Sequence, residues 1–153
     1  DKISINTQAF LYPDLVKKIV DNYGVQVLTL SVDVRKKKDH YKIFISNGQQ
    51  EVKISLEKYL YDMQKIGIGE ILINCIDRDG TLEGYDLNLL KFIKEISDVP
   101  VICLGGAGSW KHFSDAIKVS DIDAVATNNI YHFTENSIIS AKNYLKKNGY
   151  NFR

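Results

Sequence analysis

Glycine, aspartate and asparagine gather in turns that follow apolar segments of this chain, and such residues can bind anions. Asp77-Arg-Asp-Gly-Thr81 follows one apolar segment, and Gly105-Gly-Ala-Gly108 follows the next. Glycine lets a ligand approach the backbone closely, and N–H groups at helix N-termini attract phosphate. An isolated glycine more often only shapes a turn, but two neighbouring clusters favour a phosphate site. We expect Asn128 and Asn129, after a later apolar segment, to add donors to the same anion.

Asp33 is a second candidate for chemistry. It ends the apolar segment Leu28-Thr-Leu-Ser-Val-Asp33, and a partly desolvated carboxyl group suits proton transfer. Helix capping or an ion pair with Arg35 explains this residue equally well, so the sequence leaves both roles open. Asn6 and Thr7 follow an earlier apolar segment. We expect them to bind a second anion or another polar end of a long substrate.

The elements that must position these residues alternate between strands and helices. Strands are predicted at residues 2–6, 25–34, 70–77, 99–106 and 124–128, and helices at 13–24, 55–67, 88–97, 109–119 and 134–148. Five strands alternating with five helices predict parallel βα units joined by right-handed crossovers. Residues 41–52 predict a hairpin that turns at Asn47-Gly48, and the basic residues 35–38 predict a solvated loop.

Two α/β architectures fit this order of elements. A doubly wound open sheet would make residues 1–153 a complete fold. The alternative is a (β/α)8 TIM barrel, typically of ~250 residues. Gly106-Ala-Gly108 lacks the later glycine of the dinucleotide fingerprint, whereas repeated phosphate-type turns favour the barrel.

The start of the chain adds to this expectation, because it opens within a predicted strand and without Met. We therefore predict that residues 1–153 are the C-terminal portion of a single (β/α)8 barrel domain, an incomplete barrel of about five βα units. The first three βα units would then be missing. Open sheet edges in such a fragment favour self-association.

Composition argues against several other classes of function. The 44% hydrophobic and 25% charged residues are typical of a soluble globular protein, and a net charge of +1 argues against nucleic-acid binding. No apolar run approaches the ~20 residues of a membrane span. Cys75 and Cys103 lie within apolar segments, which predicts buried, reduced thiols in a cytoplasmic protein. Neither has ligand spacing with a histidine, so we expect no metal site and no cofactor.

Motifs spread along the whole chain form a specific set. They are Asp1-Lys-Ile-Ser-Ile-Asn-Thr7, Val32-Asp33, Gly69-Glu-Ile-Leu72, Ile76-Asp-Arg-Asp-Gly-Thr81, Gly84-Tyr-Asp86, Gly105-Gly-Ala-Gly108 and Tyr131-His-Phe133. Together they resemble the cyclase subunit of imidazole glycerol phosphate synthase. The sister isomerase of histidine biosynthesis shares a similar Asp-Gly-Thr turn. It does not typically carry Gly-Tyr-Asp or Gly-Gly-Ala-Gly, so these two motifs favour the cyclase.

The resemblance implies a lyase that works with a partner. The family is a (β/α)8 barrel that receives ammonia from a glutaminase subunit docked at its N-terminal face. With that ammonia it cleaves and closes a bisphosphorylated ribonucleotide in histidine biosynthesis. The products are imidazole glycerol phosphate and an aminoimidazole carboxamide ribotide. The family's second catalytic aspartate lies on the first barrel strand, so the resemblance implies that this fragment alone is inactive.

The same resemblance assigns roles to individual residues. Asp33 matches a catalytic aspartate. Lys2 and Glu70 match charged residues that gate the ammonia entrance, and Asp1 matches an acidic residue at the glutaminase interface. Asn6 and Thr7 fall at one phosphate site. The other residues assigned to substrate or phosphate binding are Asn74, Asp79, Gly80, Thr81, Gly105, Gly106, Asn128 and Asn129.

Three departures from the family pattern fall at the expected site. Asn74-Cys75 stands where the family usually has Thr-Ser, Asn128-Asn129 where it has a small residue followed by Ser, and Leu104 where it has a small polar residue. Such changes resemble cyclase-like paralogs that supply ammonia for sugar amidination in surface-glycan biosynthesis, which is the alternative function. Two further alternatives are a non-catalytic barrel that channels ammonia or activates its glutaminase, and an unrelated phosphate-binding α/β domain.

Overall fold

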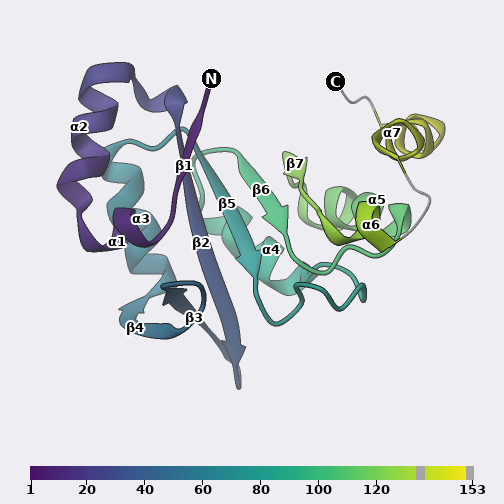
Figure 1. The fold of residues 1–153 in the computed structure, drawn as a ribbon, viewed down its shortest axis with the longest axis horizontal. Helices are drawn as coiled ribbons and strands as arrows, with labels where there is room; N and C mark the ends of the chain where they lie inside the picture. The colour runs from purple at the N-terminus through teal and green to yellow at the C-terminus, as the bar shows by residue number, and fades with distance from the viewer. Residues whose placement is uncertain (134–136, 151–153) are drawn as a thin grey trace.

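The apolar segments of the sequence form one seven-stranded mixed sheet. The computed structural model describes residues 1–133 and 137–150, and Figure 1 shows the strands with the helices around them. The strands are β1 (Ile3–Ile5), β2 (Leu28–Lys37), β3 (His40–Ile45), β4 (Gln50–Ser55), β5 (Glu70–Cys75), β6 (Val101–Leu104) and β7 (Ala124–Val125). Isoleucine, valine and leucine dominate the parallel strands because these side chains fit a pleated, buried surface.

Seven helices surround the sheet in the described part of the chain, and the side chains of Ser55 and Asp86 cap two of them. The helices are α1 (Thr7–Leu11), α2 (Pro13–Tyr23), α3 (Leu56–Ile66), α4 (Leu87–Ile96), α5 (Trp110–Ser120), α6 (Asn129–Phe133) and α7 (Ile138–Lys147), with a 3-10 turn η1 (Val25–Val27). Ser55 accepts the Lys58 N–H at the start of α3, and Asp86 accepts two N–H groups at the start of α4. α3 ends at Gly67, as predicted. Ser109 precedes α5, but its side chain makes no capping hydrogen bond.

The order of the parallel strands decides between the two architectures. β1, β2, β5, β6 and β7 pair in parallel and lie in the sheet in chain order. A doubly wound sheet reverses direction partway across, whereas this one adds each new parallel strand at the same edge. Right-handed crossovers then place successive helices on one face. The helices α2, α3, α4 and α5 contact one another in that sequence (Figure 1). The fold is an incomplete barrel of the (β/α)8 class.

The hairpin β3–β4 extends the sheet beyond the barrel strands. β2 is longer than its parallel neighbours, and its residues 33–37 pair with β3. β3 then pairs with β4 after a turn at residues 46–49. The predicted hairpin is therefore confirmed. The predicted solvated loop at residues 35–38 is wrong for Arg35 to Lys37, because pairing with β3 draws these basic residues into β2.

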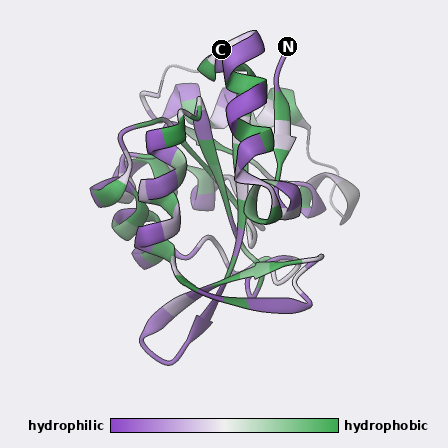
Figure 2. Cartoon of the chain, turned by 90° about the vertical axis from the view of Figure 1, so that its left-hand side faces the viewer, coloured by the Kyte–Doolittle hydropathy of each residue, from purple (hydrophilic) through white to green (hydrophobic). Residues whose placement is uncertain are grey.

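One face of the sheet packs against the helices and forms the core. Side chains alternate along a strand, so every second residue points towards the helices. The buried strand residues of this layer are Leu28, Leu30, Val32, Val34, Ile71, Ile73, Cys75, Val101 and Cys103. Figure 2 shows the helices striped with hydrophobic and hydrophilic residues, as expected for helices that bury one side.

The opposite face of the sheet, called the inner face below, carries the polar residues of the strands. The registers arrange it in three rows, which are Thr29 and Glu70; Ser31, Leu72 and Ile102; and Asp33, Asn74 and Leu104. Such rows are typical of a barrel interior. Lys2 and Asn6 flank β1 and bond to the first and third rows. The inner face thus has a charged end at Glu70 and a second polar end at Asp33.

Some elements differ from the sequence prediction. α1 follows β1 directly, and η1 takes the place of the first residues of the predicted strand 25–34. The predicted strand 124–128 is short, and the five-residue helix α6 starts at Asn129. The last predicted helix is present as α7, while residues 134–136 of that prediction lie outside the described residues.

Candidate functional site

Asp33 lies on the inner face with an amide on either side. Asn6 Nδ2 donates to Asp33 Oδ2 at 2.8 Å, and Asn74 Nδ2 donates to Asp33 Oδ1 at 3.0 Å. β2 pairs with both β1 and β5, and Asp33 lies opposite Asn74 in the register. Arg35 pairs with Asp77 instead, with 3.2 Å between Nε and Oδ1. Each carboxylate oxygen of Asp33 therefore receives one amide N–H and keeps capacity for another donor.

The two glycine-rich turns pack against each other after β5 and β6. Gly84 N–H donates to the Gly106 carbonyl at 2.7 Å. At Gly106 φ is +102°, and an added Cβ would lie 2.3 Å from the Gly84 carbonyl oxygen. An added Cβ at Gly108 would lie 2.2 Å from the Leu82 carbonyl oxygen. The missing side chains at Gly106 and Gly108 thus allow contact between two loops, where the sequence predicted the approach of a ligand.

A small pocket opens between these loops and the residues after β7. It is lined by Asp79, Gly80, Leu104, Gly105, Gly106, Ala107, Thr127, Asn128 and Asn129. Most of the residues predicted to bind phosphate meet here. At Gly80 an added Cβ would come near Asn129 Nδ2, at 3.3 Å, so backbone and side-chain amides lie close together. Barrels of this class often hold phosphate between the loops after their last two strands and a short extra helix, which here is α6.

Three lining residues of this pocket were not among the predicted binding residues. Leu104, which ends β6, was placed at the expected site only as a departure from the family pattern, and Ala107 only as part of the glycine turn, whereas Thr127 was missed. Apolar and small residues carry no chemical signal of their own. Their positions directly beside predicted residues would have been enough to find them.

Thr81 and Thr7 are engaged in other hydrogen bonds. Thr81 Oγ1 donates to the Arg78 carbonyl at 2.8 Å and stabilises its own turn, and Thr81 does not line the pocket. Thr7 Oγ1 accepts the Ser46 N–H at 2.9 Å from the β3–β4 turn. Asn74 contacts Asp33 and also lies outside the pocket lining. The structure thus gathers only part of the predicted substrate residues around one cavity.

The opposite end of the inner face carries an ion pair. Lys2 Nζ bonds Glu70 Oε2, and Thr29 Oγ1 donates to Glu70 Oε1 at 2.6 Å. Burial alone would raise the pKa of Glu70, but the hydrogen bonds from Lys2 and Thr29 outweigh burial and lower the pKa below its ordinary value. The structure brings Lys2 and Glu70 together. Thr29 was missed because a threonine within an apolar strand gives no signal until the strand register is known. Asp1 is exposed.

The cysteines are unsuited to nucleophilic chemistry. Both are free and buried, as the apolar segments around them predict. Burial raises the pKa of the Cys75 thiol to about 11 and that of the Cys103 thiol to about 12. Both thiols are therefore protonated near neutral pH.

Residues 1–133 and 137–150 contain no group of three or more histidine, cysteine, aspartate or glutamate side chains that could hold a metal ion. Within these residues no helix has both the length and the apolar character needed to cross a membrane.

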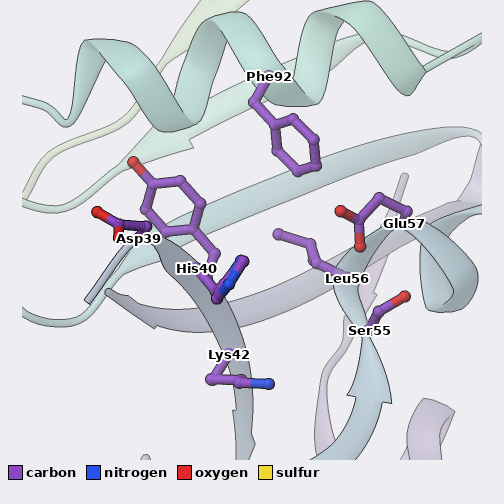
Figure 3. A pocket seen from close by; sticks show the side chains of 8 residues that line it. Asp39, His40, Lys42, Ser55, Leu56, Glu57 and Phe92 are labelled. Atoms are coloured by element: carbon purple, nitrogen blue, oxygen red, sulfur yellow. The ribbon is translucent and has the colours of Figure 1, made fainter. Parts of the chain in front are cut away.

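A larger pocket, of about 370 Å³, lies beside the hairpin. It is lined by Asp39, His40, Tyr41, Lys42, Ser55, Leu56, Glu57 and Phe92. Figure 3 shows Phe92 of α4 facing the start of α3 across this pocket. Tyr41 stacks on Phe92 and donates its hydroxyl to Asp86 Oδ2 at 3.0 Å. Acidic and basic side chains face the pocket together, so it favours no single charge of ligand.

Comparison with known proteins extends these observations. The family described as "Histidine biosynthesis protein" matches residues 1–137. Relatives named "Imidazole glycerol phosphate synthase subunit HisF" from Clostridium botulinum (strain Langeland) and Chlorobium phaeovibrioides are each 39% identical, covering 100% of the chain and 61% of the relative. One from Thermotoga sp. (strain RQ2) is 35% identical, covering 100% of the chain and 60% of the relative. The chain thus spans about three fifths of the length of these relatives. Because the family match extends along nearly the whole chain, the chain belongs to the histidine biosynthesis protein family.

Proposed function

We propose that the chain acts as the cyclase subunit of imidazole glycerol phosphate synthase, as the last five βα units of one (β/α)8 barrel domain. Ammonia from a glutaminase would convert a bisphosphorylated ribonucleotide into imidazole glycerol phosphate and an aminoimidazole carboxamide ribotide. Support comes from Asp33 and the amide-lined pocket. Both lie towards the carboxyl-terminal ends of parallel strands, in a chain 39% identical to subunits of that synthase. Barrel enzymes place their active sites at this end of the strands.

Asp33 is the group that we assign to proton transfer. Cleaving the ribonucleotide and closing the imidazole ring both move protons, and a carboxylate fixed by two amides offers an oriented acceptor for them. The pocket around Gly80 and Asn129 would hold one phosphate group of the substrate. The second phosphate would lie towards Asn6 and Thr7, at the start of α1.

The ion pair of Lys2 and Glu70 marks the entrance that we assign to ammonia. It lies at the amino-terminal end of the strands, at the far end of the inner face from Asp33. A glutaminase docked at this end, with Asp1 at the contact, would deliver ammonia along the inner face. The middle row, which contains Ser31 and Leu72, lies between the two ends.

The variant Asp33→Asn in the full-length protein tests this function. Asparagine keeps the size of the side chain but cannot take up a proton. We expect ammonium-driven formation of imidazole glycerol phosphate to fall by about 10²-fold or more, with glutaminase binding unchanged. The matched control Asp21→Asn changes an exposed residue of α2 and should keep full activity.

Two results would contradict the proposal. Wild-type protein that forms no product at saturating ammonium would exclude the histidine-pathway reaction. An Asp33→Asn variant with normal pathway output would support a non-catalytic subunit that channels ammonia or activates its glutaminase.

One observation favours a second function within the same family. Asn74 contacts Asp33, and Leu104 lines the pocket, so residues that depart from the cyclase pattern touch the candidate site. Different donors and a different volume there suit a different substrate. The alternative is a cyclase-like paralog that supplies ammonia for the amidination of a nucleotide-linked or free sugar. Product analysis with the histidine intermediate and with the sugar, each with ammonium, separates the two functions.

A further inference from the structure

Asn74 holds Asp33 from the side opposite Asn6. The parallel register of β2 and β5 sets Asn74 directly beside Asp33, and Asn74 Nδ2 donates to Oδ1 at 3.0 Å. Asn6 donates to the other oxygen, Oδ2, at 2.8 Å. Asn6 lies at the N-cap of α1, yet its side chain makes no capping hydrogen bond there. One amide on each flank therefore fixes the plane of the carboxylate.

The amide of Asn74 can satisfy Asp33 in only one orientation. Its Oδ1 is buried and has no hydrogen-bond partner among the described residues. That oxygen faces Gly105, where an added Cβ would lie 2.9 Å from it. A flipped amide would set its oxygen against the Asp33 carboxylate, which also has only acceptors when ionised. A buried oxygen without a hydrogen-bond partner is unfavourable. The favourable hydrogen bond of the Asn74 side chain is therefore the one that Nδ2 donates to Asp33.

We propose that Asn74 is a positioning residue, which orients the Asp33 carboxylate through its Nδ2 so that the free acceptor positions of Asp33 face the bound substrate. The sequence grouped Asn74 with the substrate-binding residues, whereas its contacts join it to Asp33. The role of Asn74 in turnover rests on the proposed function. The contact between Asn74 and Asp33 stands whether or not the proposed function is correct.

Steady-state kinetics of the full-length protein, with ammonium as nitrogen source, tests the role in turnover. Asn74→Leu keeps the approximate volume and removes the donor. We expect kcat to fall by about tenfold with KM nearly unchanged, because misorientation of a reacting group acts on the chemical step. Asn74→Thr places a hydroxyl donor at the same position and should recover part of that loss. Asn22→Leu makes the same chemical change on the exposed side of α2 and should match wild type.

A wild-type kcat in Asn74→Leu would overturn the proposal, as would a loss confined to KM. Equal loss of kcat in Asn74→Leu and Asn74→Thr would also count against it, because the hydroxyl donor should help.

Side-chain NMR tests the contact independently of any reaction. We compare the spectrum of the wild-type protein with that of the Asp33→Ala variant. The side-chain NH₂ signals of Asn74 should differ strongly between the two, while those of Asn22 should stay in place. Unmoved Asn74 signals would overturn the inference whatever the enzyme does. If the signals shift but wild-type protein shows no turnover of the histidine intermediate, the proposed function fails and the contact between the two side chains stands.

Discussion

Asp33 and Glu70 are carboxylates on the same face of the sheet, but their partners suit them to different roles. Asp33 receives N–H groups from two neutral amides, which orient it without cancelling its charge. Glu70 bonds a lysine and a threonine hydroxyl, so its charge is already compensated within the chain. A compensated carboxylate suits a structural or gating role. An oriented but uncompensated one suits contact with a substrate.

Glu70 gives the fold a pH dependence whose sign follows from its pKa. Because the pKa is lowered from 4.5 in the folded chain, the ionised form stabilises the fold above that value, and this contribution is lost as the pH falls through the folded pKa. We expect Glu70→Gln to lower the free energy of unfolding by about 1 kcal/mol near neutral pH. The difference from wild type should shrink towards zero in acid. Urea titrations across this pH range measure both quantities.

Glu95→Gln on the exposed side of α4 is the control for this measurement. It should change the free energy of unfolding little at either end of the pH range. A difference between Glu70→Gln and wild type that stays constant with pH would contradict the assignment of the effect to the charge of Glu70.

At the scale of elements, the loops after β5 and β6 are held together by backbone contacts rather than by side chains. The bond from Gly84 N–H to the Gly106 carbonyl joins the two turns that carry most of the pocket lining. These loops can approach only where side chains are missing. The geometry of the pocket therefore depends on glycines that need not touch a ligand.

Gly106→Ala tests this loop contact against a matched glycine. Gly106 and Gly149 both have positive φ, but an added Cβ at Gly149 meets nothing within 4 Å. We expect Gly149→Ala to lower the free energy of unfolding by about 1 kcal/mol, from conformation alone. Gly106→Ala should lower it by about 3 kcal/mol, because the clash with Gly84 adds to the same conformational cost. Urea denaturation of both variants gives the comparison, and equal losses would argue against the loop contact.

Helix capping offers a second test with an internal control. Ser55 accepts the Lys58 N–H at the start of α3, so Ser55→Ala should lower the free energy of unfolding by about 1 kcal/mol. Ser109 occupies the same position before α5 without a capping bond. Ser109→Ala should therefore change the free energy by less than about 0.5 kcal/mol. Thermal or urea unfolding measures both, and a larger loss at Ser109 would be inconsistent with this capping pattern.

The sequence predicts those features whose cause is local. Apolar runs and the glycine after α3 predict element types and several boundaries correctly. The strand at residues 35–37 was missed because its cause is pairing with β3, and a basic run alone is typical of a solvated loop. The contact of Asn74 with Asp33 was missed for a similar reason. It depends on the register between strands that are 41 residues apart in the chain.

At the scale of the whole molecule, strand order explains why the candidate groups lie at the two ends of one face of the sheet. Parallel strands in chain order bring all carboxyl-terminal ends to one edge of the inner face and all amino-terminal ends to the other. Asp33 and the ion pair of Glu70 thus lie at opposite ends of the same surface.

The sheet also has edges at β1, β4 and β7 in the described part of the chain. We propose that the isolated chain self-associates through such edges, whose unpaired backbone groups can pair with another strand.

A path for ammonia along the inner face can be tested at its middle row. Ser31 lies beside Leu72, between the row of Glu70 and the row of Asp33. In the full-length protein, Ser31→Phe should obstruct this path and lower glutamine-driven turnover severalfold. Turnover with added ammonium should stay near the wild-type rate, because ammonia from solution would reach the proposed site without passing the middle row. Ser31→Ala leaves the path clear and should keep both rates.

Equal losses with both nitrogen sources would mean that the larger side chain distorts the site. Two unchanged rates would mean that ammonia takes another route. Only the difference between the two rates depends on where ammonia enters, so that difference decides whether the Glu70 end is the entrance.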